Sequence, residues 1–336
     1  AHRRLPGEQR PCAAAQDWRC YPLRYPKHPA GKAYGRQRWA GPRAASSEGG
    51  DGLPSASVAL EADLVLSSGF LAFGNHAGFL RAVVARGVRV SGIMGTSAGA
   101  MTGSMFAAGY SPDDILRETC RDPPWRLLRP SWRFWEGLFS LDAVVERLRE
   151  LLPPTFEDLD KDFACAVLDR NGKYIVLDSG ALPEAVAASA AIPFLFRPVD
   201  IPGREAAGPF ADGGARERIG LGSWRERVRK IRPTPGNNAN DASASSDANS
   251  IEGEAGDDFA LVHLIQRSFG PLSGNDKQGS QDANFEVVTS PKSGVTLVSL
   301  GDYEQQYQQA FERTNATLER LQREAATKKV KKRATK

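Results

Sequence analysis

Hydrophobic positions in the first half of the chain alternate between short apolar runs and longer segments with helical spacing. The run Leu64, Val65, Leu66 predicts a buried strand, and HAGFLRAVVARG after it predicts a helix that ends at Gly87. VRVSGIMG predicts a second strand, and the small and apolar residues of SAGAMTGSMFAAGY predict a closely packed helix. We therefore expect strand and helix units to follow one another from the start of the fold.

The next segments continue this alternation. Ser111 and Pro112 suit the N-cap and the first position of a helix. LDAVVERLRELLPP predicts an amphipathic helix that ends before Pro153, and DFACAVLDRNGKYIVLDSG predicts a hairpin that turns at Asn171 and Gly172. Helices that alternate with strands predict a three-layer α/β/α fold with a mostly parallel central sheet.

Both ends of the chain and one internal segment differ in composition from this core. Residues 1–58 mix Pro, Gly, Arg and small residues without a hydrophobic period, which predicts a basic, disordered leader. Residues 233–258 carry six acidic residues and no basic residue, which predicts a disordered insertion. We expect the core at 59–232 and its C-terminal part at 259–327, where GVTLVSLGD predicts a strand and YEQQYQQAFERTNATLERLQREAATKK a terminal helix, before a basic tail at 328–336.

Charge and cysteine content bear on compartment and partners. The net charge of the 336 residues is +4, but residues 1–50 hold ten Lys or Arg against three acids, and the last nine residues hold six basic residues. Solvated tails are one interpretation, and attraction to anionic lipid or nucleic acid is the other. Four cysteines without paired spacing and no bilayer-length apolar run predict an intracellular, non-transmembrane protein. The acid-poor, Arg- and Ala-containing start leaves the cytoplasm or an organelle such as a plastid open.

Ser97 lies in GIMGTSAGAM, between a predicted strand and a predicted helix. Gly95 and Gly99 flank it at both two-residue distances, which is the pattern of a nucleophile elbow, because a sharp strand-to-helix turn leaves no room for side chains there. The N–H of Ala98, at the helix N-terminus, would then donate to a developing oxyanion. The alternative is a glycine-rich turn in which Ser97 only caps the helix.

A nucleophilic serine needs a base, and the chain has only four histidines. His263 would complete a Ser, acid, His triad, but it lies in the apolar run FALVHLIQRSF, where a structural histidine is the alternative. Asp212, in PFADGG, would accept the proton directly if desolvation makes its carboxylate more basic, and Gly213 and Gly214 permit an unusual backbone path. Asp212 is the better candidate, with a plain Asp-Gly turn as its alternative.

Several motifs, taken in order, resemble the patatin-like phospholipase family. LVLSSGF, GTSAG, ALPEAVAASAAIPFLFRPVDI and DGG follow one another over residues 62–214, and GLFSLDAVVERLRELLP resembles the family's middle region. The resemblance implies a Ser-Asp dyad, with Ser97 as nucleophile and Asp212 as base, that hydrolyses lipid acyl esters through an acyl-enzyme. It implies no metal or organic cofactor. Ser189 and Pro193 are expected to shape a buried turn that leads toward the aspartate.

The oxyanion loop departs from the family's pattern. The family carries GGGxRG or GGGxKG, and this chain has SSGFLAFGNHAG, which resembles the GCGFLG variant of adiponutrin-like lipases. Alignment at His76 and Gly78 places Ser68, Gly69 and Phe70 opposite the three glycines and Ala72 opposite the basic residue. Backbone N–H groups of Gly69, Phe70 and Ala98 are expected to form the oxyanion hole. The alternative is a catalytically weak lipid-binding or regulatory patatin-like protein.

The stretch WRLLRPSWRFW interleaves aromatic and basic side chains. Trp and Arg suit the interface of an anionic membrane, since rings embed and guanidinium groups meet phosphate. A packed domain surface and nucleic-acid stacking are the alternatives. We expect a lipid substrate, no nucleic acid, and peripheral contact with a membrane or lipid droplet through Trp125, Arg126, Arg129, Trp132, Arg133 and Trp135.

Overall fold

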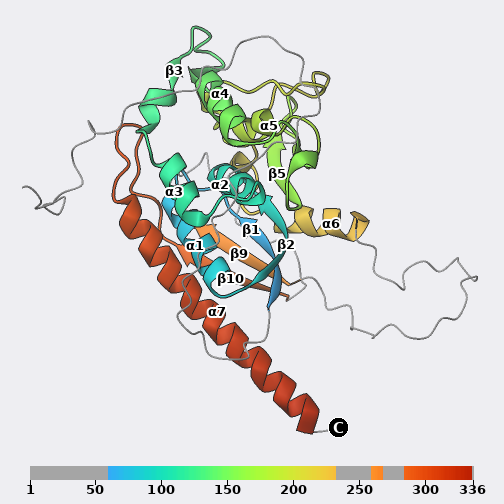
Figure 1. Ribbon diagram of the computed structural model, residues 1–336. Helices are drawn as coiled ribbons and strands as arrows, with labels where there is room; N and C mark the ends of the chain where they lie inside the picture. Colours follow the sequence, from blue (N-terminus) through green and yellow to red (C-terminus); the bar gives the residue numbers. More distant parts are fainter. Residues whose placement is uncertain (1–59, 232–258, 268–283, 335–336) are drawn as a thin grey trace, which may run out of the picture. The chain divides into compact units, whose positions relative to one another are not determined.

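The computed structural model describes residues 60–231, 259–267 and 284–334, in which the apolar runs of the sequence form a central sheet (Figure 1). The predicted leader and acidic insertion lie outside the described residues. The strands of the sheet are Glu61–Leu66 (β1), Arg89–Gly95 (β2), Phe163–Leu168 (β5), Tyr174–Leu177 (β6), Ala211–Asp212 (β8), Ala260–Ile265 (β9) and Phe285–Ser290 (β10).

The sheet has the order β10-β9-β1-β2-β5-β6, and β8 also pairs with β5. Strands β10, β9, β1, β2 and β5 are parallel to their neighbours, whereas β6 and β8 are antiparallel to β5. A smaller sheet joins Arg129–Pro130 (β3), Gly137–Ser140 (β4) and Phe194–Phe196 (β7). The predicted mostly parallel central sheet is therefore confirmed.

Helices cover both faces of the sheet, which makes the fold a three-layer α/β/α arrangement. The helices are Phe73–Ala85 (α1), Ala98–Ala107 (α2), Pro112–Thr119 (α3), Asp142–Leu151 (α4), Leu182–Ser189 (α5), Leu221–Ile231 (α6) and Tyr303–Ala334 (α7), and short 3-10 turns lie at Pro124–Leu127, Phe156–Asp158 and Gly213–Ala215. No helix among the described residues has both the length and the apolar character needed to span a bilayer.

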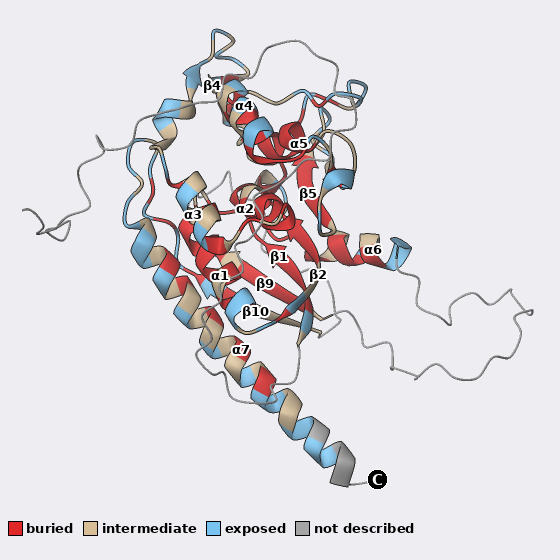
Figure 2. Ribbon diagram, viewed as in Figure 1, coloured by how far each residue is buried: buried red, intermediate tan, exposed pale blue. Residues whose placement is uncertain are grey.

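Successive side chains of a strand point to opposite faces, so the chain builds two apolar cores. Leu64 and Leu66 of β1 belong to the larger core, which includes residues of α1, α2 and α5, and Figure 2 shows these elements buried. Val65 belongs to the second core, beneath α6. There Trp224 is fully buried, and its indole N–H donates to the Asp63 carboxylate over 2.8 Å.

Local signals of the sequence set the ends of several elements. The Ser111 hydroxyl accepts the N–H of Asp114 over 3.2 Å and so caps α3 as predicted. The hairpin of β5 and β6 turns at Gly172, which has φ of 71°. The strand predicted at GVTLVSLGD is wrong, because Thr296 N–H turns back to the Ser299 carbonyl and Gly301 takes φ of 58°. The core strand of this region is β10, which precedes it in the sequence.

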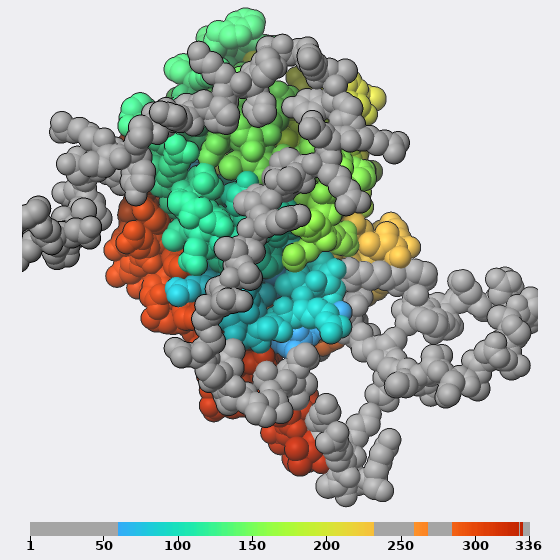
Figure 3. Space-filling model, viewed as in Figure 1, coloured from blue at the N-terminus to red at the C-terminus, as the bar shows by residue number. Residues whose placement is uncertain are grey.

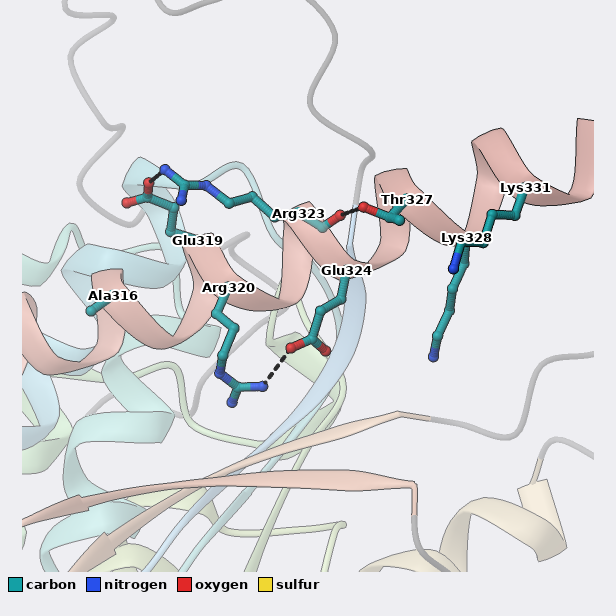
Figure 4. Close-up of a pocket in the computed structure, with 8 residues that line it drawn as sticks. All are labelled: Ala316, Glu319, Arg320, Arg323, Glu324, Thr327, Lys328 and Lys331. Carbon is teal, nitrogen blue, oxygen red and sulfur yellow. Dashed lines mark hydrogen bonds and ion pairs between the residues drawn. The ribbon is translucent and has the colours of Figure 1, made fainter. Parts of the chain in front are cut away.

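Helix α7 packs along α1 and continues into the predicted basic tail. Its buried residues recur three and four positions apart, as in an amphipathic helix: Tyr307, Ala310, Thr314, Leu318 and Gln322. Beyond them the helix runs on to Ala334, so residues 328–334 are helical rather than a separate tail. Ion pairs one turn apart, such as Arg320 with Glu324 over 3.0 Å, favour this extension (Figure 4).

Glycines let α1 and α7 approach closely. A Cβ at Gly78 would lie 2.0 Å from the Tyr307 carbonyl oxygen, and a Cβ at Gly74 would lie 2.7 Å from that of Tyr303. No rotamer change relieves a clash with backbone, so α7 fixes which residue types α1 accepts at these positions.

Replacement of Gly78 by alanine should therefore destabilise the protein. Overpacking of this kind costs about 1–3 kcal/mol of unfolding free energy, which chemical denaturation measures. Gly294→Ala is the matched control, because nothing lies within 4 Å of the added Cβ, and it should stay within about 0.5 kcal/mol of wild type. Equal stability of the two variants would contradict the close packing of α1 on α7.

Candidate functional site

Ser97 lies on a sharp turn between β2 and α2. Its φ of 55° and ψ of −119° are unusual for a residue with a side chain, and such strain costs of order 1–3 kcal/mol. A Cβ at Gly95 would lie 2.6 Å from the Ala100 Cα, and a Cβ at Gly99 would lie 2.2 Å from the Leu66 carbonyl oxygen. The backbone around Ser97 thus leaves no room for a side chain at either position. The hydroxyl makes no capping bond to α2, which argues against the simple capping interpretation.

Asp212 ends β8 with its side chain buried, only 4% exposed. The Ser97 hydroxyl faces this carboxylate and favours its ionised form, and the Gly214 N–H donates to Oδ1 over 2.7 Å. Burial raises the pKa of Asp212 to about 7, against the opposing effects of these two donors and of the positive charge of Arg218. A carboxylate with a pKa near neutrality is suited to accept and return a proton.

The C-terminal end of α5 holds both residues in place. The Ser97 N–H donates to the Ser189 hydroxyl oxygen over 2.9 Å, and the Asp212 N–H donates to the Ala191 carbonyl over 2.9 Å. A Cβ at Gly213 would lie 2.8 Å from backbone atoms of Ala166 on β5, so the turn after the aspartate lies directly on the sheet. The segment that contains Ser189 and Ala191 therefore forms one hydrogen bond to Ser97 and one to Asp212.

The loop after β1 lies beside this pair. The close approach of Gly99 to the Leu66 carbonyl places the start of α2 against the loop, and a Cβ at Gly214 would lie 2.6 Å from the Ser68 Cβ. Within the described part of the chain, the N–H groups of Gly69 and Ala98 have no hydrogen-bond partner. The Phe70 carbonyl accepts the Ser293 hydroxyl. The arrangement can offer backbone donors to an oxyanion formed at Ser97.

Two buried histidines support the loop. The Ser67 carbonyl can only accept, so His76 Nε2 donates to it over 3.0 Å and His76 Nδ1 accepts from His263 Nδ1 over 2.9 Å. His263 Nε2 then accepts the Ser290 hydroxyl over 3.0 Å. Burial lowers the pKa of His76 to about 3 and that of His263 well below its usual value, so both rings are neutral. With both nitrogens engaged, His263 is structural, and the triad interpretation is wrong.

Arg218 contacts the same loop, although no pattern in the sequence predicted this role. Its side chain is buried, and its guanidinium donates to the Ser68 carbonyl over 3.0 Å and to the Ile265 carbonyl over 2.5 Å. Burial of an arginine is not visible in sequence. Its place in GARERIGLG, directly after the DGG motif, was the available signal.

Aromatic side chains of the WRLLRPSWRFW stretch are exposed. Trp132 is 77% and Phe134 69% exposed, which argues against a packed surface. Strand β7 places Phe194, 74% exposed with φ of 67°, opposite Gly137 of β4. We define the aromatic surface as Trp132, Phe134, Trp135, Leu138 and Phe194, and the residues around 130 lie at the top of the view in Figure 3.

The arginines beside the aromatic surface are paired with acids. Arg126 lies 2.8 Å from Asp122, Arg129 lies 3.4 Å from Glu146, and Arg133 lies 2.5 Å from Glu136. These pairs are exposed and the positive charge is compensated locally. The expectation of attraction to an anionic surface therefore loses most of its support here.

A hollow along α7 does not belong to this site (Figure 4). It is lined by Arg320, Arg323, Glu324 and neighbouring residues of one helix, and contains neither Ser97 nor Asp212. Its charged groups pair with one another, as Arg323 does with Glu319, or with adjacent elements, as Arg320 does with Glu286 of β10.

Residues 64–223 match the sequence model of the family described as patatin-like phospholipase. Uncharacterized NTE family proteins of Mycobacterium tuberculosis and Mycobacterium bovis are each 30% identical over 155 residues, which cover 45% of this chain and 42% of the relative. The chain thus matches less than half the length of these curated relatives.

Two solved structures resemble the chain at a coarser level. VipD from Legionella pneumophila has a TM-score of 0.41 and 15% identity, covering 80% of this chain and 68% of VipD. The type III effector protein ExoU has a TM-score of 0.43 and 16% identity, covering 79% of this chain and 54% of ExoU.

The buried carboxylate should make Asp212→Asn more stable than wild type at alkaline pH. The folded protein keeps this proton up to about pH 7, whereas an unfolded aspartate releases it near pH 4, so wild type loses stability as pH rises between these values. The amide does not titrate, so the gain in Tm should be largest above pH 7 and shrink toward pH 4. A variant that melts below wild type at pH 8 would contradict the assignment.

Proposed function

Because residues 64–223 match the sequence model of the patatin-like phospholipase family, a family of lipid acyl hydrolases, we propose that the chain cleaves acyl esters of phospholipids or related glycerolipids through a Ser97 and Asp212 dyad. One observation carries this proposal. The Ser97 hydroxyl, held on a strained turn, faces a buried carboxylate whose pKa is about 7. A serine esterase of the phospholipase A or acylglycerol lipase type needs this pairing of nucleophile and base.

Each half of the reaction uses the same groups. Ser97 Oγ attacks the ester carbonyl carbon while Asp212 takes the hydroxyl proton, and the N–H groups of Gly69, Phe70 and Ala98 stabilise the oxyanion. The tetrahedral intermediate collapses, the alcohol leaves with the proton from Asp212, and the acyl group stays on Ser97. Water then attacks the acyl-enzyme with Asp212 again as base, which releases the fatty acid and restores the serine hydroxyl.

A lipid-binding protein with little catalysis is the second candidate function. It is favoured by the loop SSGFLAFG, whose Leu71 takes φ of 50° and which has Ser68 and Phe70 in place of two of the three consecutive glycines of the usual oxyanion loop. Against it stand the uncommitted N–H groups of Gly69 and Ala98 in the described part of the chain. Labelling by a fluorophosphonate distinguishes the two, because only an activated serine reacts.

Ser97→Ala and Asp212→Asn should each lower ester turnover by about 10³-fold or more, since members of a catalytic unit act together. Hydrolysis of p-nitrophenyl butyrate and of phosphatidylcholine vesicles measures this loss, with Ser91→Ala and Asp200→Asn as matched controls. For wild type, kcat/KM should rise with pH with a midpoint near 7, because the base must be ionised. Full turnover by a folded Asp212→Asn variant would exclude the dyad.

We further propose that the aromatic surface, with Trp125 and the adjoining arginines Arg126, Arg129 and Arg133, docks on a membrane or lipid droplet as a peripheral contact. The exposed rings would bury apolar area in the interface. Because the arginines are paired with acids, apolar burial rather than attraction to anionic headgroups would provide the affinity.

Trp132→Ala combined with Phe134→Ala should weaken binding to phosphatidylcholine vesicles by about tenfold or more, given roughly 1.5–3 kcal/mol for each buried apolar side chain. Vesicle sedimentation at low and high salt measures this, and wild-type binding should change little with salt. Val330→Ala, which removes a 67% exposed apolar side chain on α7, is the control. Unchanged binding of the double variant would contradict the docking surface.

A further inference from the structure

Arg218 holds the residue that precedes the expected oxyanion donor. Its Nη2 donates to the Ser68 carbonyl over 3.0 Å, and its Nε donates to the Ser68 hydroxyl oxygen over 3.3 Å. In return, the Arg218 carbonyl accepts the Ser68 N–H over 2.8 Å. One arginine, itself only 2% exposed, thus contacts the N–H, the carbonyl and the side chain of Ser68.

This contact sets the direction of the next N–H group. The Ser68 carbonyl and the Gly69 N–H belong to one planar peptide unit and point in opposite directions. A bond from Arg218 to the carbonyl therefore turns the Gly69 N–H away from the guanidinium. The same Nη2 donates to the Ile265 carbonyl over 2.5 Å, and a Cβ at Gly69 would lie 2.7 Å from the Ile265 side chain. Arg218 thus joins the loop to the strand against which Gly69 lies.

Arg218 also acts on the base. Its positive charge favours the ionised form of Asp212, as do the nearby Ser97 hydroxyl and the hydrogen bond from the Gly214 N–H. The other titratable group that faces Asp212 is the Tyr174 phenol on β6, which in turn faces Glu217 and Cys165. Burial raises the pKa of that phenol far above neutrality, so Tyr174 stays uncharged while Asp212 titrates.

We propose that Arg218 is a positioning residue of the hydrolytic site, which orients the Gly69 N–H toward the oxyanion and keeps Asp212 in its charged form. This inference rests on the proposed function. The loop SSGFLAFG is then held in part by hydrogen bonds from Arg218, which belongs to the segment after the DGG motif. Because Arg218 bonds the loop and not the reacting atoms, it should affect kcat and leave KM nearly unchanged.

The test compares Arg218→Gln, Arg218→Lys and the control Arg216→Gln by pH profiles of p-nitrophenyl butyrate hydrolysis. Arg216 lies on the same segment, is exposed, and donates to the Gly172 carbonyl over 2.9 Å, so its loss should change neither kcat nor the pH midpoint. Arg218→Gln should lower kcat by about 10- to 100-fold and move the acid limb to higher pH. Arg218→Lys keeps the positive charge but loses the planar set of guanidinium N–H donors. The acid limb of its pH profile should therefore stay at the wild-type pH, while kcat still falls about tenfold.

Circular dichroism and Tm establish which variants fold. Wild-type kcat and pH midpoint in folded Arg218→Gln would overturn the inference. If that variant does not fold, Arg218→Lys decides alone, and an unchanged kcat in it would overturn the positioning role. Absence of Ser97-dependent turnover in wild type would instead overturn the proposed function, and with it any role of Arg218 in hydrolysis.

Discussion

Burial of the Asp212 carboxylate is the constraint on which the rest of the site depends. In the interior a lone carboxylate would bind a proton and hold it well above neutral pH. Here the Gly214 N–H, the Ser97 hydroxyl and the charge of Arg218 each favour the ionised form, and the pKa settles at about 7. A carboxylate with this balance is suited to the proton transfer that the proposed dyad requires.

The backbone supplies the rest of the constraint. The first turn of α2 lies so close to β1 that residue 99 must be glycine, and Ser97 must take a strained conformation to connect the strand to this helix. All of α2 except Met101 is buried, so the packing of small side chains opposes relaxation of the turn. The end of α5 adds a bond to each partner, which keeps the distance between serine and aspartate independent of the surface loops.

The sequence predicted the elements whose information is local. The β1, α1, β2, α2 succession followed from apolar spacing, and the glycines around Ser97 followed from the shape of the turn they occupy. Asp212 needed more, since an Asp-Gly turn alone is a common feature and only the family resemblance distinguished it. The strand prediction at GVTLVSLGD failed because a short apolar run alone does not define a strand, and it is β10 that pairs in register with β9.

Long-range contacts could not be read from the pattern. His263 lies 187 residues from His76 in sequence, and Arg218 lies 150 residues from Ser68, so neither pairing leaves a periodic signal. Burial decides both roles: a buried histidine with two bonded nitrogens is structural, and a buried arginine beside a loop orders it. These are properties of the folded neighbourhood rather than of any short segment.

The central sheet extends beyond the part of the chain that matches the family model. The match to the family's sequence model ends at residue 223, yet β1 takes one of its two strand neighbours, β9, from beyond that point. Ile265, Ser290 and Ser293, which contact the loop or its histidines, also come from there. A fragment cut at the edge of similarity would hold both Ser97 and Asp212, but with an open sheet edge and one wall of its loop missing. Ser97 and Asp212 thus lie within the part of the chain that matches the family model, whereas part of the structure that supports them lies outside it.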